Sequence, residues 1–136
     1  MKNGLSYFEV PEIAKIHWVC HAFLTRTGGS SPPPYDSLNL SEGSGDEMKE
    51  VAWNRLRVAN AFEFDEKNLF LLDQVHKDQI LLLKEDGLPL PPRNYDAVIT
   101  AFPRAFLGIL TADCIPIFVA DQKKRVSAAI HAGRQG

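Results

Sequence analysis

His76, Cys114 and His131 are the residues of this chain whose chemistry most suggests a site. Cysteine thiolate and neutral imidazole are ligands that zinc prefers, and three of them leave a fourth tetrahedral position for water or substrate. An open position separates a catalytic metal from a structural one. If the three residues converge in the fold, the chain is a metalloenzyme or a large part of one.

Cys114 follows Asp113 directly after an apolar run, at a point where the chain must turn before Pro116. Strand ends often carry reactive groups, because a rigid sheet holds them while loops give access. A thiolate at this place could ligate a metal or act as a nucleophile. The alternative for a free cysteine is a small buried core residue.

His131 ends a predicted strand over residues 126–130. Strand alternation places Ser127, Ala129 and His131 on one face, where the small residues leave room for a ligand or a metal. A hydrogen-bonded structural histidine is the alternative. His76 closes another apolar run and could instead face solvent at a turn.

Arg26 opens a loop rich in glycine, serine and proline, which Asn39 closes. A guanidinium beside Gly28 and Gly29 is a plausible cradle for an anion. The alternative is a solvated loop charge.

The hydrophobic pattern of the rest of the sequence predicts a mixed α/β chain, whose helices and strands would hold these residues. Residues 16–25 predict an early strand. A helix is predicted from near Ser44, which has capping-box spacing to Glu47. The apolar face of this helix is predicted to contain Met48, Val51, Ala52, Leu56, Ala59 and Phe62.

The second half of the sequence predicts short strands, with a proline-rich turn over residues 86–92. The continuous apolar runs indicate strands that are buried on both faces. The predicted strands are 69–72, 79–84, 97–100, 106–110, 115–119 and 126–130.

Length and composition predict one soluble globular domain over residues 1–136, with 45% hydrophobic and 24% charged residues. A formal charge of -2 gives no basic surface for nucleic acid. No apolar signal-peptide core and no membrane-length stretch is present, which predicts a cytoplasmic protein without membrane contact. In that reducing compartment, a disulfide between Cys20 and Cys114 is not expected.

A series of motifs occurs in a fixed order along the chain: Thr25-Arg26-Thr27-Gly28-Gly29-Ser30, Tyr35-Asp36-Ser37-Leu38-Asn39-Leu40, Gly45-Asp46, Asn54-Arg55, Gln74-Val75-His76, Asp96-Ala97-Val98-Ile99-Thr100, Thr111-Ala112-Asp113-Cys114-Ile115-Pro116 and His131-Ala132-Gly133. In this order they resemble the YfiH/LACC-type family, also called the laccase-domain or multicopper polyphenol oxidase family. Other names are the purine nucleoside phosphorylase YfiH group and the peptidoglycan editing factor group. The resemblance runs from about residue 25 to the end.

The resemblance implies a mixed α/β fold with layered sheets and flanking helices, similar to a toxin deamidase of the cysteine-hydrolase type. It implies a zinc site formed by His76, Cys114 and His131. Family members continue well beyond this length, so the chain resembles an N-terminal portion with an incomplete fold. Where the family has tryptophan and a basic residue after His-Ala-Gly, this chain has Arg134 and Gln135, so an aromatic wall of the pocket is expected to differ.

The implied activity is phosphorolysis of adenosine, inosine, guanosine and methylthioadenosine, together with deamination of adenosine. The expected partners are therefore a nucleoside and phosphate. Formation of a homodimer is left as a possibility. We assign catalytic roles to Cys114, His131 and Asp113, with Asp113 as the proton carrier. Substrate-binding roles are assigned to Arg26, Asn39 and Gln74.

Three alternatives remain. The first is a metal-free cysteine hydrolase, or a peptidoglycan-precursor editing hydrolase, with Cys114 as nucleophile and His131 as base. The second is a copper-dependent polyphenol oxidase, which the sequence disfavours, because a trinuclear copper cluster needs more than the four histidines present. Adventitious copper at the three-ligand site could still give weak oxidase activity. The third is an inactive truncated domain.

Overall fold

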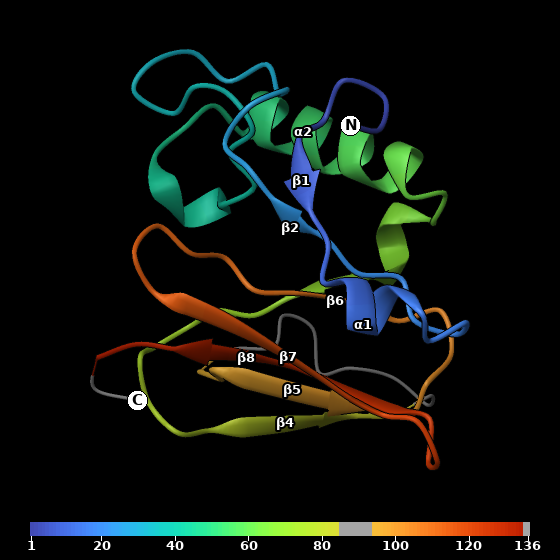
Figure 1. The fold of residues 1–136 in the computed structure, drawn as a ribbon. Coiled ribbons are helices and arrows are strands. Elements are labelled where there is room, and N and C mark those ends of the chain that lie inside the picture. The colour runs from blue at the N-terminus through green and yellow to red at the C-terminus, as the bar shows by residue number, and fades with distance from the viewer. Residues whose placement is uncertain (85–93, 135–136) are drawn as a thin grey trace. The chain divides into compact units, whose positions relative to one another are not determined.

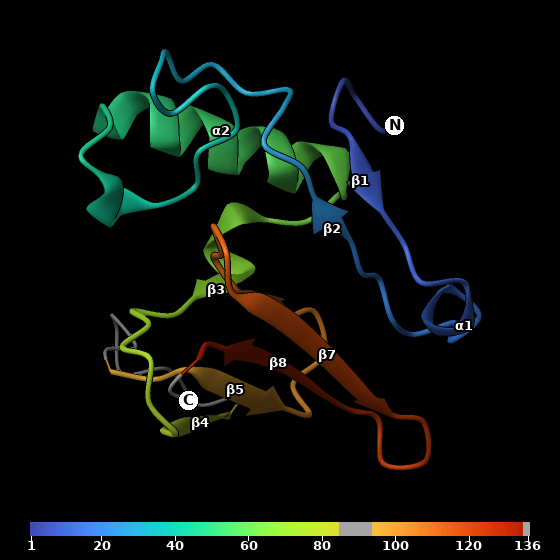
Figure 2. The same ribbon diagram turned by 60° about the vertical axis from the view of Figure 1, so that its left-hand side comes forward.

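The computed structural model describes residues 1–84 and 94–134 (Figures 1 and 2). Contacts within the chain group it into two compact units, Met1–Glu66 and Lys67–Gly136. The single domain expected from the sequence stays a prediction. The proline-rich turn predicted over residues 86–92 and the residue Gln135 lie outside the described residues. No helix in the described ranges is long and apolar enough to cross a membrane.

The first unit contains a small sheet and the longest helix described. Strand β1 (Tyr7–Phe8) pairs antiparallel with β2 (Phe23–Leu24), and helix α1 (Pro11–Ala14) lies between them in the sequence. A 3-10 helix (Glu42–Ser44) precedes helix α2 (Met48–Ala61), and a second one (Glu66–Asn68) follows it. The apolar core of this unit is formed by Leu5, Leu38, Val58 and Ala61, packed with Leu24, Leu40, Phe62 and Phe64.

The strand predicted over residues 16–25 is wrong apart from Phe23–Leu24. The N–H groups of Ile16 and Val19 each donate to the carbonyl three residues earlier, at 2.9 Å, so the segment turns instead of extending. The imidazole of His21 accepts the N–H of Val10 at 2.8 Å, which gives this segment a side-chain partner in place of a strand partner.

The prediction for α2 was right about the helix but wrong about its start and part of its buried face. Its N-cap is Glu47, which makes no capping hydrogen bond through its side chain. Ser44 belongs to the preceding 3-10 helix and donates to the carbonyl of Ser41 at 2.8 Å, so the predicted capping box does not form. Met48 and Leu56 are exposed, and Asn54 is fully buried on the inner face.

The second unit contains two sheets, and the predicted strands of this half are confirmed with small changes in their ends. Strand β3 (Leu69–Leu71) pairs parallel with β6 (Phe106–Gly108). The larger sheet has the order β4-β5-β8-β7, with all four strands side by side in Figure 1. Its members are β4 (Ile80–Leu83), β5 (Ala97–Thr100), β7 (Ile115–Asp121) and β8 (Val126–Ala132).

Only one face of the four-stranded sheet is covered by described residues. On that face Leu81, Val98 and Ala129 are buried, and residues of β3 and β6 pack against them. On the opposite face Leu82, Ile115 and Val119 are exposed, by 61%, 65% and 51%. The prediction of strands buried on both faces is therefore wrong for β4 and β7, because no layer among the described residues covers their second apolar face.

Candidate metal centre

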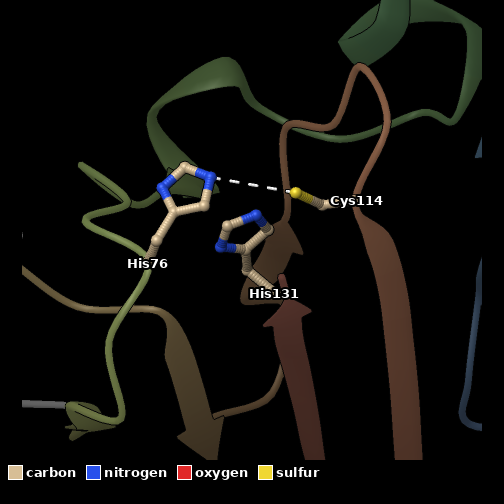
Figure 3. A group of neighbouring side chains, drawn as sticks. All are labelled: His76, Cys114 and His131. Carbon is tan, nitrogen blue, oxygen red and sulfur yellow. Dashed lines mark hydrogen bonds between the residues drawn. The ribbon is translucent and has the colours of Figure 1, made fainter. Parts of the chain in front are cut away.

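His76, Cys114 and His131 converge at one end of the four-stranded sheet (Figure 3). Cys114 directly precedes β7, and His131 lies near the end of β8. These strands are antiparallel with Pro116 opposite His131, so the start of one meets the end of the other. His76 comes from the connection between β3 and β4. One ligand atom from each residue lies within 4.8 Å of the other two.

Within the cluster, His131 is shielded from solvent and His76 is exposed to it. The side chain of His131 is 2% exposed, Cys114 is half-buried and free of any disulfide, and His76 is exposed. Nε2 of His76 lies 3.8 Å from Sγ of Cys114, and the two imidazole rings meet edge to face at 4.5 Å. A ligand could therefore reach the group from the side of His76 while His131 stays shielded.

Asp96 is the residue that the sequence analysis missed at this site. It lies directly before β5, and its buried carboxylate accepts a hydrogen bond from Nδ1 of His131 at 2.8 Å. The same carboxylate accepts the backbone N–H groups of Val75, His76 and Lys77, at distances from 2.8 to 3.3 Å. The signal that could have found it is its position at one end of an apolar strand, because strand ends often carry reactive groups.

Burial alone would raise the pKa of Asp96, because it removes water from the carboxylate. The hydrogen bonds from Lys77, His131 and His76, together with the attraction of the His131 imidazole, outweigh burial and hold the pKa below its ordinary value. Asp96 is therefore ionised when the protein is near neutral pH and can accept all of these hydrogen bonds.

The backbone of His76 has a positive φ of 58°, in the left-handed region that residues with side chains rarely adopt. Such a conformation costs of order 1–3 kcal/mol and persists where the surroundings over-determine it. Here three successive N–H groups turn toward one carboxylate, which gives the physical reason for the conformation.

Gln74 and Asp113, to which roles in the site were assigned, have different surroundings. The amide of Gln74 donates to the carbonyl of Leu110 and accepts its N–H, both at 2.8 Å. Gln74 therefore links the segment before His76 to the segment before Cys114. Asp113 is exposed next to Cys114. The substrate-binding role of Gln74 and the proton-carrier role of Asp113 stay predictions.

Arg26 and Asn39 belong to the first unit, where each has partners of its own. The guanidinium of Arg26 donates to the Asp36 carbonyl at 2.7 Å and forms an ion pair with the Asp36 carboxylate at 3.0 Å. The N–H groups of Gly28 and Gly29 both donate to Oγ of Ser37, at 3.1 Å. A phosphate bound at this loop would therefore have to replace existing hydrogen bonds.

The amide of Asn39 donates to Oγ of Ser44 at 2.7 Å and to the carboxylate of Asp46 at 3.0 Å. Burial alone would raise the pKa of Asp46, but hydrogen bonds from Ser31, Asn39 and the N–H of Glu47 lower it by more, so it lies below its ordinary value. Asn39 thus organises the loop before α2, and its substrate-binding role stays a prediction.

Fold and cluster together define a mixed α/β protein with a His-Cys-His group at one end of its larger sheet. A family model described as multi-copper polyphenol oxidoreductase laccase matches residues 20–136. The chain belongs to this family, so the resemblance seen in its motifs is confirmed.

Relatives and solved structures support the same assignment. The chain is 41% identical over 133 residues to a purine nucleoside phosphorylase of Deinococcus radiodurans, covering 98% of this chain and 49% of that protein. It is 36% identical to the purine nucleoside phosphorylase YfiH of Escherichia coli, covering 97% of this chain and 53% of that protein. The crystal structure of the Bacillus licheniformis protein YfiH superposes with a TM-score of 0.80 at 30% identity, covering 85% of this chain and 46% of that one.

The predicted α/β fold of the YfiH type is thereby confirmed for the part of the fold that this chain contains. The chain spans about half the length of the curated relatives it matches. What those longer proteins do enters below as a proposal for this chain.

Proposed function

We propose that this chain carries the metal centre of a zinc-dependent enzyme that acts on purine nucleosides. The observation that carries the proposal is the convergence of His76, Cys114 and His131, whose ligand atoms lie within 4.8 Å of one another. The nucleoside class rests on relatives named purine nucleoside phosphorylase. Phosphorolysis is the proposed reaction, with adenosine deamination as a second activity of the same site.

The separation between His76 and Cys114 supports zinc as the metal. Zinc lies about 2.0–2.1 Å from histidine nitrogen and about 2.3 Å from cysteine sulfur, so tetrahedral ligands of these two kinds lie about 3.5 Å apart. The 3.8 Å between Nε2 of His76 and Sγ of Cys114 is within a few tenths of an ångström of that separation. The hydrogen bond from Nδ1 of His131 to Asp96 leaves Nε2 of His131 for the metal.

The residues of the chain would have different roles in this reaction. His76, Cys114 and His131 would hold the ion, which supplies Lewis-acid activation of a water molecule or a substrate atom when bound. In phosphorolysis, a phosphate oxygen bonds to the sugar carbon as the bond to the base breaks, and the leaving base takes up a proton. Asp113, exposed beside Cys114, is the proposed proton carrier. A role of Arg26 in holding phosphate stays a prediction, and in the first unit its guanidinium is paired with Asp36.

A metal-free cysteine hydrolase is the second candidate, because Cys114 already contacts an imidazole. The sequence alone predicts His131 as its base. In the structure, the histidine in hydrogen-bonding range of Sγ is His76, and the Nδ1 of His131 is bonded to Asp96. In this alternative the base would therefore be His76.

Copper oxidase chemistry is not favoured. The described ranges contain one group of this kind, His76, Cys114 and His131, and the whole chain has four histidines. A trinuclear copper cluster needs many more.

Metal analysis combined with a nucleoside assay tests the proposal. We expect one zinc ion per chain in the parent and loss of zinc in His76→Ala, Cys114→Ser and His131→Ala. The exposed residues His17 and Cys20 provide matched controls, and the variants His17→Ala and Cys20→Ser should keep the metal. Turnover is followed as release of free base, which requires phosphate, and as release of ammonia, which does not.

A chelator separates the two candidates. Removal of zinc should abolish turnover in the proposed enzyme and should leave a cysteine hydrolase active. A parent protein that contains no zinc and gains no activity on adding it would contradict the proposal.

A further inference from the structure

The carboxylate of Asp96 contacts two segments that each supply a metal ligand. It is almost completely buried, with 3% of its side chain exposed. Its Oδ1 accepts from Nδ1 of His131 and from the N–H of His76, each at 2.8 Å. Its Oδ2 accepts the N–H of Lys77 at 2.8 Å. One side chain therefore joins the end of β8 to the connection between β3 and β4.

The contact with His131 decides which ring nitrogen faces the cluster. A carboxylate only accepts hydrogen bonds, so the proton of the neutral imidazole must lie on Nδ1. The lone pair of Nε2 is then free to ligate a metal, and the ring cannot rotate without losing a buried hydrogen bond. The backbone adds a second connection, because the N–H of His131 donates to the carbonyl of Asp96 at 2.7 Å.

The contact with His76 acts through the backbone. Three consecutive N–H groups, from Val75 to Lys77, point at the same carboxylate and hold His76 at its positive φ. This conformation directs the imidazole of an otherwise exposed residue toward Cys114 (Figure 3). Without an acceptor for these groups, the segment would relax and the imidazole would leave the cluster.

We propose that Asp96 is the positioning residue of the metal centre, which fixes the tautomer of His131 and the backbone of His76 with a single carboxylate. This inference rests on the proposed function, because it assumes that the cluster binds a metal. Asp96 contacts Nδ1 of His131, whereas Nε2 of the same ring would bind the metal, so Asp96 is not assigned as a ligand. Cys114 is then the one ligand that the carboxylate does not hold.

The test compares Asp96→Asn with a matched acid-to-amide change, Asp121→Asn. Asp121 also accepts two backbone N–H groups, those of Lys123 and Lys124, at 2.9 and 3.0 Å. Asp121 lies at the opposite end of β7 from Cys114. With the rise per residue of an extended strand, the two residues are about 20 Å apart. An asparagine at position 96 has one acceptor oxygen and one NH2 group, so it cannot accept both the hydrogen bonds made at Oδ1 and the one made at Oδ2.

Zinc affinity is measured by competition with a chelator, and the ligand set by the absorption spectrum of the Co²⁺-substituted protein. We expect Asp96→Asn to bind zinc about 10–100-fold more weakly than the parent, with a weakened or shifted Co²⁺ spectrum. Asp121→Asn should match the parent in both. Parental affinity and spectrum in Asp96→Asn would overturn the inference and leave the proposed function intact. A parent that binds neither ion would instead contradict the proposed function.

A measurement on the parent keeps the inference testable if Asp96→Asn does not fold. Nitrogen-15 NMR of the metal-free protein reports which ring nitrogen of His131 carries the proton. We expect the proton on Nδ1. A proton on Nε2 would overturn the role of Asp96 whether or not the protein binds metal.

Discussion

Two buried polar side chains, Asn54 in the first unit and Asp96 in the second, each hold a loop in place. Asn54 is completely buried, accepts the N–H of Ser30 at 2.9 Å, and donates to Oγ of Ser31 and to the carbonyls of Ser37 and Asn39. Its amide both donates and accepts, so it satisfies opposite backbone groups of one loop. Asn54 therefore stabilises the Gly/Ser/Pro loop without placing a charge there.

Asp96 differs because it can only accept. It gathers N–H donors from two segments, and one of those donors belongs to an imidazole. A neutral amide in its place could not take all of these hydrogen bonds. The comparison indicates that a buried amide supports a loop, whereas a buried carboxylate can also set the orientation of a ligand.

The largest effect on folding is expected from Asn54→Ala. It leaves the buried hydroxyl of Ser31 and groups of Ser30, Ser37 and Asn39 without their partner, and we expect a loss of about 3–5 kcal/mol of unfolding free energy. Both tryptophans of the chain, Trp18 and Trp53, lie in the first unit, so fluorescence during urea unfolding reports on that unit. Zinc affinity should not change. A large loss of zinc affinity in a folded Asn54→Ala protein would contradict the proposed difference between Asn54 and Asp96.

Gly29→Ala tests the same loop from its backbone. A side chain at Gly29 would collide with the Ser37 carbonyl, the Asn54 amide and the backbone of Leu38. We expect a loss of about 1–3 kcal/mol, seen as a lower urea midpoint in tryptophan fluorescence. The matched control is Gly43→Ala, where nothing lies near the added carbon. Equal midpoints for the two variants would contradict this description of the loop.

Lowering the pH should reduce the stability of the second unit, because it protonates Asp96. Its pKa in the folded chain is lowered, because its hydrogen bonds outweigh burial. The ionised carboxylate therefore stabilises the fold at pH values above its unfolded pKa of about 3.9, and this contribution is lost as pH falls through the folded pKa. Amide hydrogen exchange of β5 and β8 between about pH 6 and pH 3 measures it. Asp96→Asn should show a weaker acid dependence, and an unchanged dependence would argue against the assignment.

The smallest effect is expected from Asp121→Asn. Hydrogen bonds from the N–H groups of Lys124 and Lys123 lower the pKa of Asp121 in an exposed turn. An asparagine oxygen can accept the same bonds, so we expect a loss of at most about 0.5 kcal/mol by urea unfolding followed with circular dichroism. If Asp121→Asn loses as much unfolding free energy as Asp96→Asn, the loss of a carboxylate that accepts backbone N–H groups explains both results. A role of Asp96 in orienting ligands would then not be needed.

The sequence predicts the ligands better than the residues that position them. His76, Cys114 and His131 have side chains with recognisable metal chemistry, and Cys114 and His131 lie at the ends of strands. Asp96 lies in one of the motifs, but its role cannot be predicted from the sequence, because its partners are mostly backbone N–H groups about 20 residues away. A backbone N–H has no sequence signature, so the convergence appears only in the fold.

The same reason explains the errors in the first unit. The periodicity of α2 correctly predicts a helix, but it places Leu56 inside and gives no reason to bury Asn54. Asn54 is buried because four groups of a loop satisfy its amide, and that loop lies outside the helix sequence. Apolar patterning detects burial by hydrophobic packing, whereas burial by hydrogen bonding depends on distant parts of the chain.

X-ray absorption at the zinc edge of the purified protein reports directly which atoms bind the metal. We expect the zinc ligands to be one sulfur at about 2.3 Å and two imidazole nitrogens at about 2.0–2.1 Å, completed by one light atom. The Cys114→Ser variant, which should lose zinc on purification, should show no sulfur ligand when zinc is added back in excess. A shell of oxygen atoms only, or zinc that keeps its sulfur in that variant, would contradict a His76-Cys114-His131 metal centre.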